Sequence, residues 1–236
     1  MKILKVNGTI VDDGDAIFYE HWGMPHTSPK MVHDFLDKLN GESIQVYINS
    51  GGGSVFAGSE IYTALKKYSG QVETIATGVA ASIASVILMA GDYVRVSPIS
   101  QIMIHNASMI SRGDHRDLEH DSKTLEGTSL SLANVYAEKT GMEVKAIKEM
   151  MDSETWLTAD KAVYYGFADS ILFNDDIVEM VASMSPIVPK EKINEFKSLV
   201  MQQEQGKKKE KNTNYFEKIV EVRKNEQKSN FAKFVK

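Results

Sequence analysis

The spacing of apolar residues changes from segment to segment along the N-terminal part of the chain. Residues 1–11 alternate apolar and polar side chains, which is typical of a half-buried strand. Glycines and a proline between residues 14 and 25 favour a loop. Ser28 followed by Pro29 is typical of a helix start, and helical spacing continues to residue 40. One stripe of that helix consists of Val32, Phe35, Leu36 and Leu39.

The following segments repeat strand and helix patterns. Strands are predicted at residues 44–48, 72–76, 93–96, 102–104 and 170–173. Helices are predicted at residues 55–67, 83–90, 143–151 and 158–166, together with one extended helix over residues 112–140. Strands that alternate with helices predict an α/β protein, and no internal repeat is present.

Composition changes near residue 186. One helix is predicted at residues 191–203, and the segment from Glu204 to the end has ten Lys or Arg and five Glu. The tail therefore has a net charge of +5 and the body of −10, which sum to the −5 of the whole chain. Because apolar residues are sparse in the tail, a solvated, partly disordered extension is favoured over a nucleic-acid-binding arm. We predict one domain over residues 1–185 and a helical, basic, partly disordered extension over residues 186–236.

The composition of the whole chain is that of a soluble globular protein. Its 236 residues suffice for a sizeable core, and the absence of cysteine excludes disulfides and thiolate catalysis. The N-terminus lacks a signal-peptide pattern, and the longest apolar stretch, residues 79–90, is shorter than the roughly 20 residues that span a bilayer. We expect a cytoplasmic protein with no membrane partner.

A strand, a glycine-rich turn and a helix follow one another around residues 49–54. Such a turn presents backbone N–H groups to an anion, and phosphate binding is one interpretation. The lysine of a P-loop and the spaced glycines of a dinucleotide site are both absent. An oxyanion hole therefore fits better than a phosphate site.

Ser82 and His105 are the candidates for chemistry. Ser82 follows the small residues 78–81 and opens an apolar helix, a placement that displays a nucleophile among unpaired N–H donors. His105 ends a buried strand, where a general base is held firmly and still reaches a cleft. Asp152 and Glu154 precede a helix, and either carboxylate could orient the histidine as the third member of a triad. Each residue, considered alone, also has an ordinary structural role.

Histidines and carboxylates also gather in the long helix between residues 112 and 140. His115, His120 and their acidic neighbours lack the spacing of a zinc motif, so we interpret them as a solvated helix face. We expect neither a metal ion nor another cofactor.

Several segments together resemble the ClpP family of serine peptidases, especially the shorter ClpP-like proteins of phages and prophages. The matching blocks, in the family's order, are Tyr47–Gly53, Ala80–Ser82, Met103–Asn106, and a fourth that runs from Trp156–Ala159 to Asp169–Ile171. Four ordered blocks between residues 43 and 173 are much more specific than any one motif.

The resemblance implies a fold, an assembly and a set of roles. The fold would be a ClpP/crotonase-like spiral of β-β-α units with residues 112–140 as the handle helix, in heptameric rings stacked face to face. Ser82 would be the nucleophile, His105 the base and Glu154 the acid, with Asp152 as the alternative acid. The oxyanion donors would be the amides of Gly53 and Ile83, and an unfolded polypeptide would lie along Gly52 and Gly53. Phage relatives imply a role in capsid maturation.

The chain departs from the family in ways that bear on function. Glu154 stands where aspartate is usual, and Gly51 replaces the usual proline. The N-terminal segment is unlike the loops that engage an ATP-driven unfoldase, which puts such a partner in doubt. Two alternatives remain: a ring-forming protein without activity, and a crotonase-type acyl-CoA enzyme that uses the same kind of oxyanion hole.

Overall fold

The structure, a computed structural model, describes residues 1–173. The predicted domain boundary after residue 185, the helix at 191–203 and the basic tail lie outside these residues, so they remain predictions.

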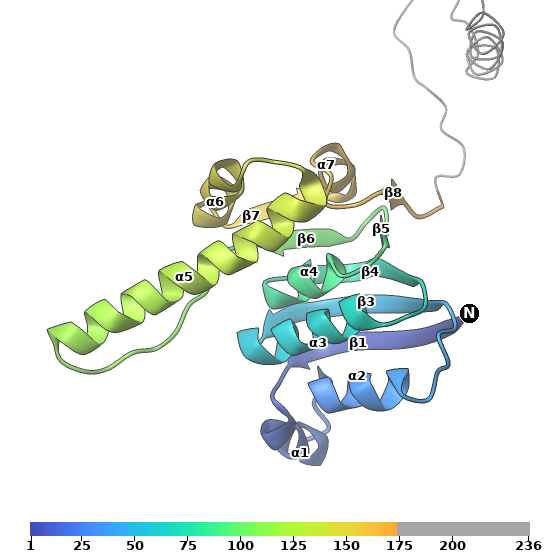
Figure 1. Cartoon of the computed structure of the whole chain (residues 1–236), viewed down its shortest axis with the longest axis horizontal. Helices are drawn as coiled ribbons and strands as arrows, with labels where there is room; N and C mark the ends of the chain where they lie inside the picture. The colour runs from blue at the N-terminus through green and yellow to red at the C-terminus, as the bar shows by residue number, and fades with distance from the viewer. Residues whose placement is uncertain (174–236) are drawn as a thin grey trace, which may run out of the picture. The chain divides into compact units, whose positions relative to one another are not determined.

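A twisted sheet carries the fold (Figure 1). Its strands are β1 (Lys2–Ile10), β2 (His26–Thr27), β3 (Ile44–Gly53), β4 (Val72–Ala81), β5 (Tyr93–Val96), β6 (Gln101–Ile104), β7 (Thr155–Thr158) and β8 (Ser170–Ile171). The order is β2-β1-β3-β4-β5-β8, and β6 pairs with both β4 and β7. Only the β6–β7 pair is antiparallel among the pairs of the described residues. Parallel strands end at the same edge, so residues that follow β1, β3 and β4 meet there.

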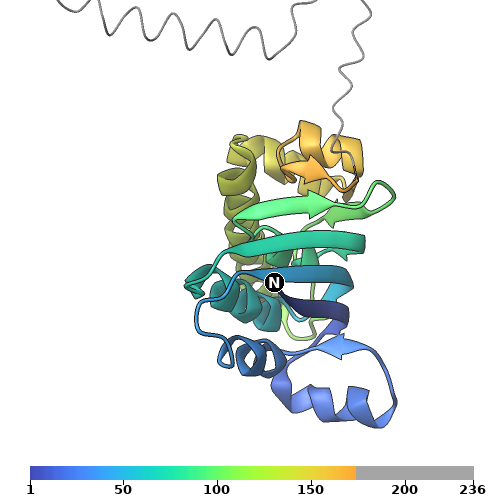
Figure 2. The same ribbon diagram turned by 90° about the vertical axis from the view of Figure 1, so that its right-hand side faces the viewer.

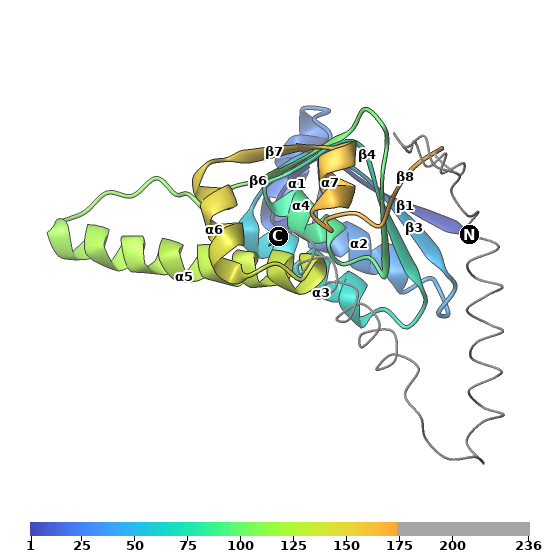
Figure 3. The ribbon, with the colours of Figure 1, turned by 90° about the horizontal axis from the view of Figure 1, so that it is seen from above.

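Helices cover one face of this sheet and extend beyond it. They are α1 (Asp13–His21), α2 (Pro29–Leu36), α3 (Val55–Lys67), α4 (Ile83–Leu88), α5 (His115–Thr140), α6 (Val144–Asp152) and α7 (Ala159–Tyr164). Helices α2, α3 and α4 lie on the same face (Figures 1 and 2). Helix α5 projects away from the sheet, and its residues 115–128 include no buried side chain (Figure 3).

The core follows from the apolar patterns. Ile44, Val46 and Ile48 alternate along β3 and are fully buried. They pack in one cluster with buried residues of α3 and α4, among them Ile61 and Ile87. This burial of aliphatic side chains between sheet and helices is the main source of the domain's stability.

Asp169, which belongs to one of the segments that resemble the family, has a structural role. Its Oδ2 accepts hydrogen bonds from the Val94 amide at 2.6 Å and from Lys139 Nζ at 2.8 Å. Its own amide donates to the Val94 carbonyl. This carboxylate therefore ties the start of β8 to β5 and to the end of α5.

Several elements differ from the sequence prediction. Residues 13–21 form α1 where a loop was expected, with Asp13 and Asp15 favourably placed in the first turn. Strand β3 continues through Gly53, because residues 49–53 pair with β1 and β4 although they contain three glycines. The long helix begins at residue 115 and not at 112, since Asp114 forms a capping box with Asp117 there.

Candidate active site

Ser82 lies between the end of β4 and the start of α4 in a strained backbone conformation. Its φ of 56° and ψ of −132° are rare for a residue with a side chain. Ala81 and Ile83 on either side are buried, which holds the turn in place. Ser82 makes no side-chain capping bond, so its hydroxyl is available for other contacts. Strain of this kind is maintained where the surrounding structure fixes it, as it does at many active sites.

His105 reaches this hydroxyl. Its Nε2 lies 2.7 Å from Ser82 Oγ, a hydrogen-bonding distance. The approach is set by the sheet: Ala81 in β4 is in register with Met103 in β6, and the Ser82 amide donates to the Met103 carbonyl at 2.9 Å. Each residue follows its strand directly, so the parallel pairing of β4 with β6 brings together the serine and histidine predicted from sequence. The pair has the spacing of a nucleophile and its base.

A buried hydrogen-bond chain supports the serine from behind. Ser85 Oγ donates to the Ser82 carbonyl at 2.6 Å and lies 2.8 Å from the hydroxyl of Tyr136 on α5. Since the single Ser85 hydroxyl proton goes to the carbonyl, Tyr136 is the donor in the second bond. Burial raises the pKa of Tyr136 well above its ordinary value, so the phenol stays protonated and remains a donor. Sequence reasoning missed both residues, because they look like ordinary helix positions.

The glycine-rich end of β3 lies against Ser82. A Cβ added to Gly52 would lie 2.7 Å from Ser82 Cβ and 2.9 Å from the Ala81 carbonyl oxygen. One added to Gly53 would lie 2.1 Å from the Ile10 carbonyl oxygen. Both residues also have positive φ, 97° and 150°. Glycine is therefore required at both positions.

The two amides expected to form the oxyanion hole flank this region. Ile83 is the first residue of α4, where N–H groups have no acceptor within the helix. Gly53 follows Gly52 in the strand that touches Ser82. Helix α3 packs closely on Ile83: a Cβ on Gly58 would lie 2.2 Å from Ile83 Cγ1. Gly58 is thus a further residue that shapes the site and that the sequence patterns did not reveal.

Of the two candidate acids, Asp152 is the exposed last residue of α6, and Glu154 lies on the exposed turn between α6 and β7. Glu154 Oε1 accepts a hydrogen bond from Trp156 Nε1 at 3.3 Å, and Asp152 Oδ1 accepts one from Asn106 Nδ2 at 2.7 Å. Among the residues that the structure describes, His105 has its one hydrogen bond to Ser82. Within residues 1–173, neither acid forms a hydrogen bond with His105: Asp152 binds the side chain of Asn106, the next residue, and Glu154 binds Trp156.

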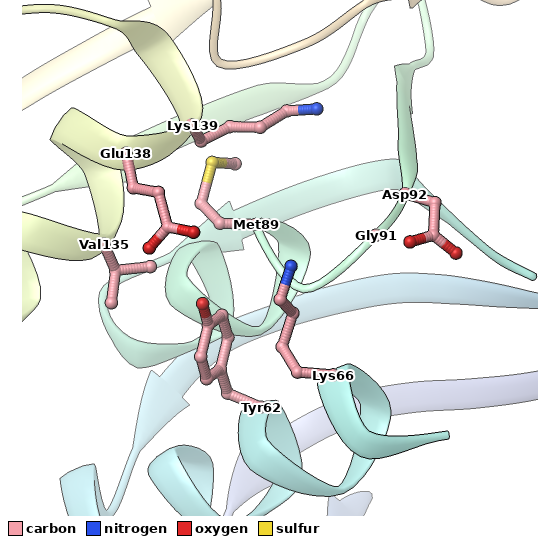
Figure 4. Close-up of a pocket in the computed structure, with 8 residues that line it drawn as sticks. All are labelled: Tyr62, Lys66, Met89, Gly91, Asp92, Val135, Glu138 and Lys139. Atoms are coloured by element: carbon pink, nitrogen blue, oxygen red, sulfur yellow. The ribbon is translucent and has the colours of Figure 1, made fainter. Parts of the chain in front are cut away.

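A separate pocket lies where α3, α4 and α5 end (Figure 4). It has a volume of about 300 Å³, and Tyr62, Lys66 and Glu138 are among its lining residues. Partial burial, with a smaller contribution from the nearby charge of Glu138, raises the pKa of Tyr62. Neither Ser82 nor His105 lines this pocket, so it is distinct from the candidate active site.

Residues 1–173 contain neither a helix suited to a membrane nor a cluster of side chains suited to a metal ion. No helix there combines the length and the apolar character needed to cross a membrane. The histidines and carboxylates of the same residues form no group of three or more that could hold a metal ion. The side chains of His115 and His120 on α5 are exposed.

Known proteins match most of the described chain. The Clp protease family model matches residues 28–175. The ATP-dependent Clp protease proteolytic subunit of Bacteroides fragilis is 37% identical over 141 residues, which are 58% of this chain and 68% of that protein. The corresponding subunit of Porphyromonas gingivalis is 36% identical over 141 residues, 58% of this chain and 64% of the relative. Subunit 1 of Protochlamydia amoebophila is 32% identical over 175 residues, 72% of this chain and 80% of the relative.

The matched region contains the residues of the candidate active site. The alignments span about two thirds of the length of the first two relatives. The family region includes Ser82, His105, both glycines at the end of β3 and both candidate acids. The predicted ClpP-like α/β fold is confirmed by this match together with the parallel sheet and its helices. The chain belongs to the Clp protease family, a family of serine-type peptidases.

Proposed function

We propose that the chain is a serine endopeptidase that cleaves extended polypeptide with Ser82 as nucleophile and His105 as general base. The observation that carries the proposal is the 2.7 Å contact between His105 Nε2 and Ser82 Oγ, made by a serine with a strained backbone. A hydroxyl is a weak nucleophile at neutral pH, and a histidine within hydrogen-bonding distance activates it.

The reaction follows from this contact. As Ser82 Oγ attacks a peptide carbonyl carbon, its proton passes to His105 Nε2, and the carbonyl oxygen becomes an oxyanion. The amides of Gly53 and Ile83 stabilise that charge in the proposal. His105 then gives the proton to the leaving amine, and water releases the acyl group by the same route in reverse. One lost oxyanion donor typically costs about 10²-fold or more in rate.

Glu154 is the proposed acid, and Asp152 is the alternative. Sequence position favours Glu154, which replaces the family's usual aspartate. Thr155 pairs with Ile104, so Glu154 and His105 each adjoin the same residue pair. An acid in this role would stabilise the imidazolium that forms when the serine proton is removed. Glu154→Gln should then lower kcat more than Asp152→Asn.

Substrate and assembly are proposed from family resemblance. Extended polypeptide would add as a strand beside Gly52 and Gly53. The relatives are named as proteolytic subunits of an ATP-dependent protease, which supports assembly into stacked heptameric rings. Copurification with a Clp-type ATPase would test whether an unfoldase acts on this assembly. Maturation of phage capsid proteins is the biological role that the phage relatives suggest, and cleavage of purified head or scaffold protein tests it.

The experiment that tests the catalytic proposal is labelling with a fluorophosphonate, followed by intact mass. The wild-type chain should gain one adduct at Ser82, and Ser82→Ala and His105→Ala should gain none. Ser108→Ala is the matched control, because this exposed serine lies three residues after His105 and should not affect labelling. Particle mass by light scattering is measured on the same samples.

The outcomes separate the alternatives. Absence of labelling on a large ring would contradict the catalytic proposal and favour a ring-forming protein without activity. Hydrolysis of an acyl-CoA that persists in Ser82→Ala would favour a crotonase-type enzyme. Labelling at another serine would refute the assignment of Ser82.

A further inference from the structure

Helix α1 is an exposed element with no buried residue. From Asp12 to Pro25, only Ala16 and Tyr19 are even partly buried. The helix is attached to the rest of the chain by a ring contact between Tyr19 and His26 and by a hydrogen bond from the Lys30 amide to Asp13 Oδ1. Short helices are marginal in water without tertiary packing. A second binding surface would supply the packing that this helix lacks.

Large apolar side chains are displayed on this element. The exposed fractions of Trp22, Ile17, Phe18 and Met24 are 67%, 65%, 53% and 47%. We call these four residues the α1 patch. Phe18 and Trp22 are one helical turn apart, and their ring centroids lie 6.3 Å from each other. Exposed apolar groups gathered in one place mark an interaction site more often than scattered ones do.

The formal charges within the segment that holds the α1 patch have one sign, and Lys30 at the start of α2 is a cation beside it. Residues 12–25 contain three Asp, one Glu and no Lys or Arg, which gives a formal charge of −4. All four carboxylates, those of Asp12, Asp13, Asp15 and Glu20, belong to exposed residues. Two copies of this patch would repel each other, whereas a segment with basic and apolar residues complements it.

The position of α1 relates this surface to the catalytic serine. Ile10 is in register with Gly53, and Gly53 follows the glycine that touches Ser82. Asp13 is three residues beyond Ile10, a chain length of at most about 11 Å. Strands β1 and β4 are parallel to β3 between them, so α1 and Ser82 lie at the same edge of the sheet. Figure 1 shows α1 at the end of β1, and Figure 2 shows it at the far end of the sheet from α7.

We propose that the α1 patch is a second binding site for the polypeptide substrate, and that it selects segments in which basic and apolar residues are interspersed. The proposal rests on the proposed peptidase function for the identity of the ligand as substrate. Two strand spacings of about 4.8 Å separate β4 from β1, so α1 begins at most about 20 Å from Ser82; a bound chain in extended form advances about 3.3 Å per residue, so about six residues beyond the scissile bond would reach α1. Substrates shorter than that contact only the region around Ser82.

Binding can be tested without catalysis. The chain has two tryptophans, so the double variant Ser82→Ala/Trp156→Phe has Trp22 as its single tryptophan, which is excited selectively over tyrosine, and it cannot use the proposed nucleophile. The probe is a twelve-residue peptide in which Lys and Leu alternate, and the control peptide has Glu in place of Lys. The expected result is a saturable change in Trp22 emission, with at least tenfold weaker binding for the Glu peptide and for the Lys peptide in high salt.

Two results of this titration would overturn the proposal. One is the same emission with and without the Lys peptide. The other is Trp22 emission that shifts to shorter wavelength as protein concentration rises in the absence of peptide, because a second copy would then cover the patch.

Cleavage gives an independent test. Phe18→Ser/Trp22→Ser should lower kcat/KM for the twelve-residue Lys peptide about tenfold or more, as loss of aromatic anchors does elsewhere. Labelling of Ser82 and cleavage of a four-residue peptide should not change. Tyr164→Ser on α7 is the matched control, since its aromatic ring is 82% exposed at the opposite side of the sheet.

Equal loss of long-peptide and short-peptide cleavage in the α1 variant would refute the second site. Failure of the peptidase proposal looks different: the wild-type chain would cleave neither peptide and would not be labelled, whereas the Trp22 titration would still report binding.

Discussion

The buried chain from Tyr136 through Ser85 to the Ser82 carbonyl makes a quantitative prediction. Tyr136 donates to Ser85, and Ser85 donates to Ser82. Ser85→Ala removes the bond to the turn and also leaves a fully buried phenol without its acceptor. Tyr136→Phe removes the phenol and leaves Ser85 with its own donation intact. The two substitutions should therefore have unequal effects.

The magnitudes follow from the number of bonds lost and the group left unpaired. Tyr136→Phe loses one hydrogen bond, a cost of about 1 kcal/mol in the free energy of unfolding. Ser85→Ala loses a similar bond and also leaves the Tyr136 hydroxyl without an acceptor, which adds about 1–3 kcal/mol. The double variant has no unpaired phenol, so its cost should be less than the sum of the single costs by the same amount, about 1–3 kcal/mol.

Urea unfolding of the three variants and the wild type, at one protein concentration, measures these differences. The rate of fluorophosphonate labelling at Ser82 is measured on the folded proteins and should fall more in Ser85→Ala than in Tyr136→Phe. A Tyr136→Phe variant less stable than Ser85→Ala, or strictly additive costs, would show that the chain does not run in the direction assigned.

Three further predictions concern single positions. Gly52→Ala should abolish labelling because its methyl group has no room, whereas Gly51→Ala should leave labelling unchanged because a Cβ there meets nothing within 4 Å. Gly58→Ala should slow labelling by displacing the first residue of α4, whereas Gly127→Ala, in an open position of α5, should raise stability by about 0.5–1 kcal/mol. Because burial raises the folded-state pKa of Tyr136, its contribution is present below the ordinary tyrosine pKa and is lost as pH rises above it. Above the ordinary tyrosine pKa, the free energy of unfolding should thus fall less steeply with rising pH in Tyr136→Phe than in the wild type.

Much of the fold could be predicted from periodicity. The alternation along β3 and the stripe of α2 were visible because each is buried on one face, and burial is what periodicity reports. Helix α1 was missed for the same reason. Its apolar residues face solvent, so they gave no stripe beside a core, and Gly14 and Gly23 at its ends favoured a loop.

The site was predicted unevenly. Ser82 and His105 could be found because each ends a buried strand, and a reactive residue in that place has a local signature. Ser85 and Tyr136 lie 51 positions apart in sequence, and nothing local distinguishes them from other helix residues. The need for glycine at residue 58 depends on the approach of α4, which only the packed structure reveals.

The contrast between the serine and the acids explains where substitutions in this site are tolerated. The Ser82 amide is held by β6, its carbonyl by Ser85, and its neighbours Ala81 and Ile83 by burial, so its geometry depends on the core. Glu154 is exposed, with a positive φ of 45°, on a turn that no such ladder holds. A longer side chain in place of aspartate can therefore be accommodated by movement of the turn alone. The same longer side chain at the nucleophile's position would have to displace two buried neighbours, so a substitution of Ser82 by a larger residue should disturb the turn itself.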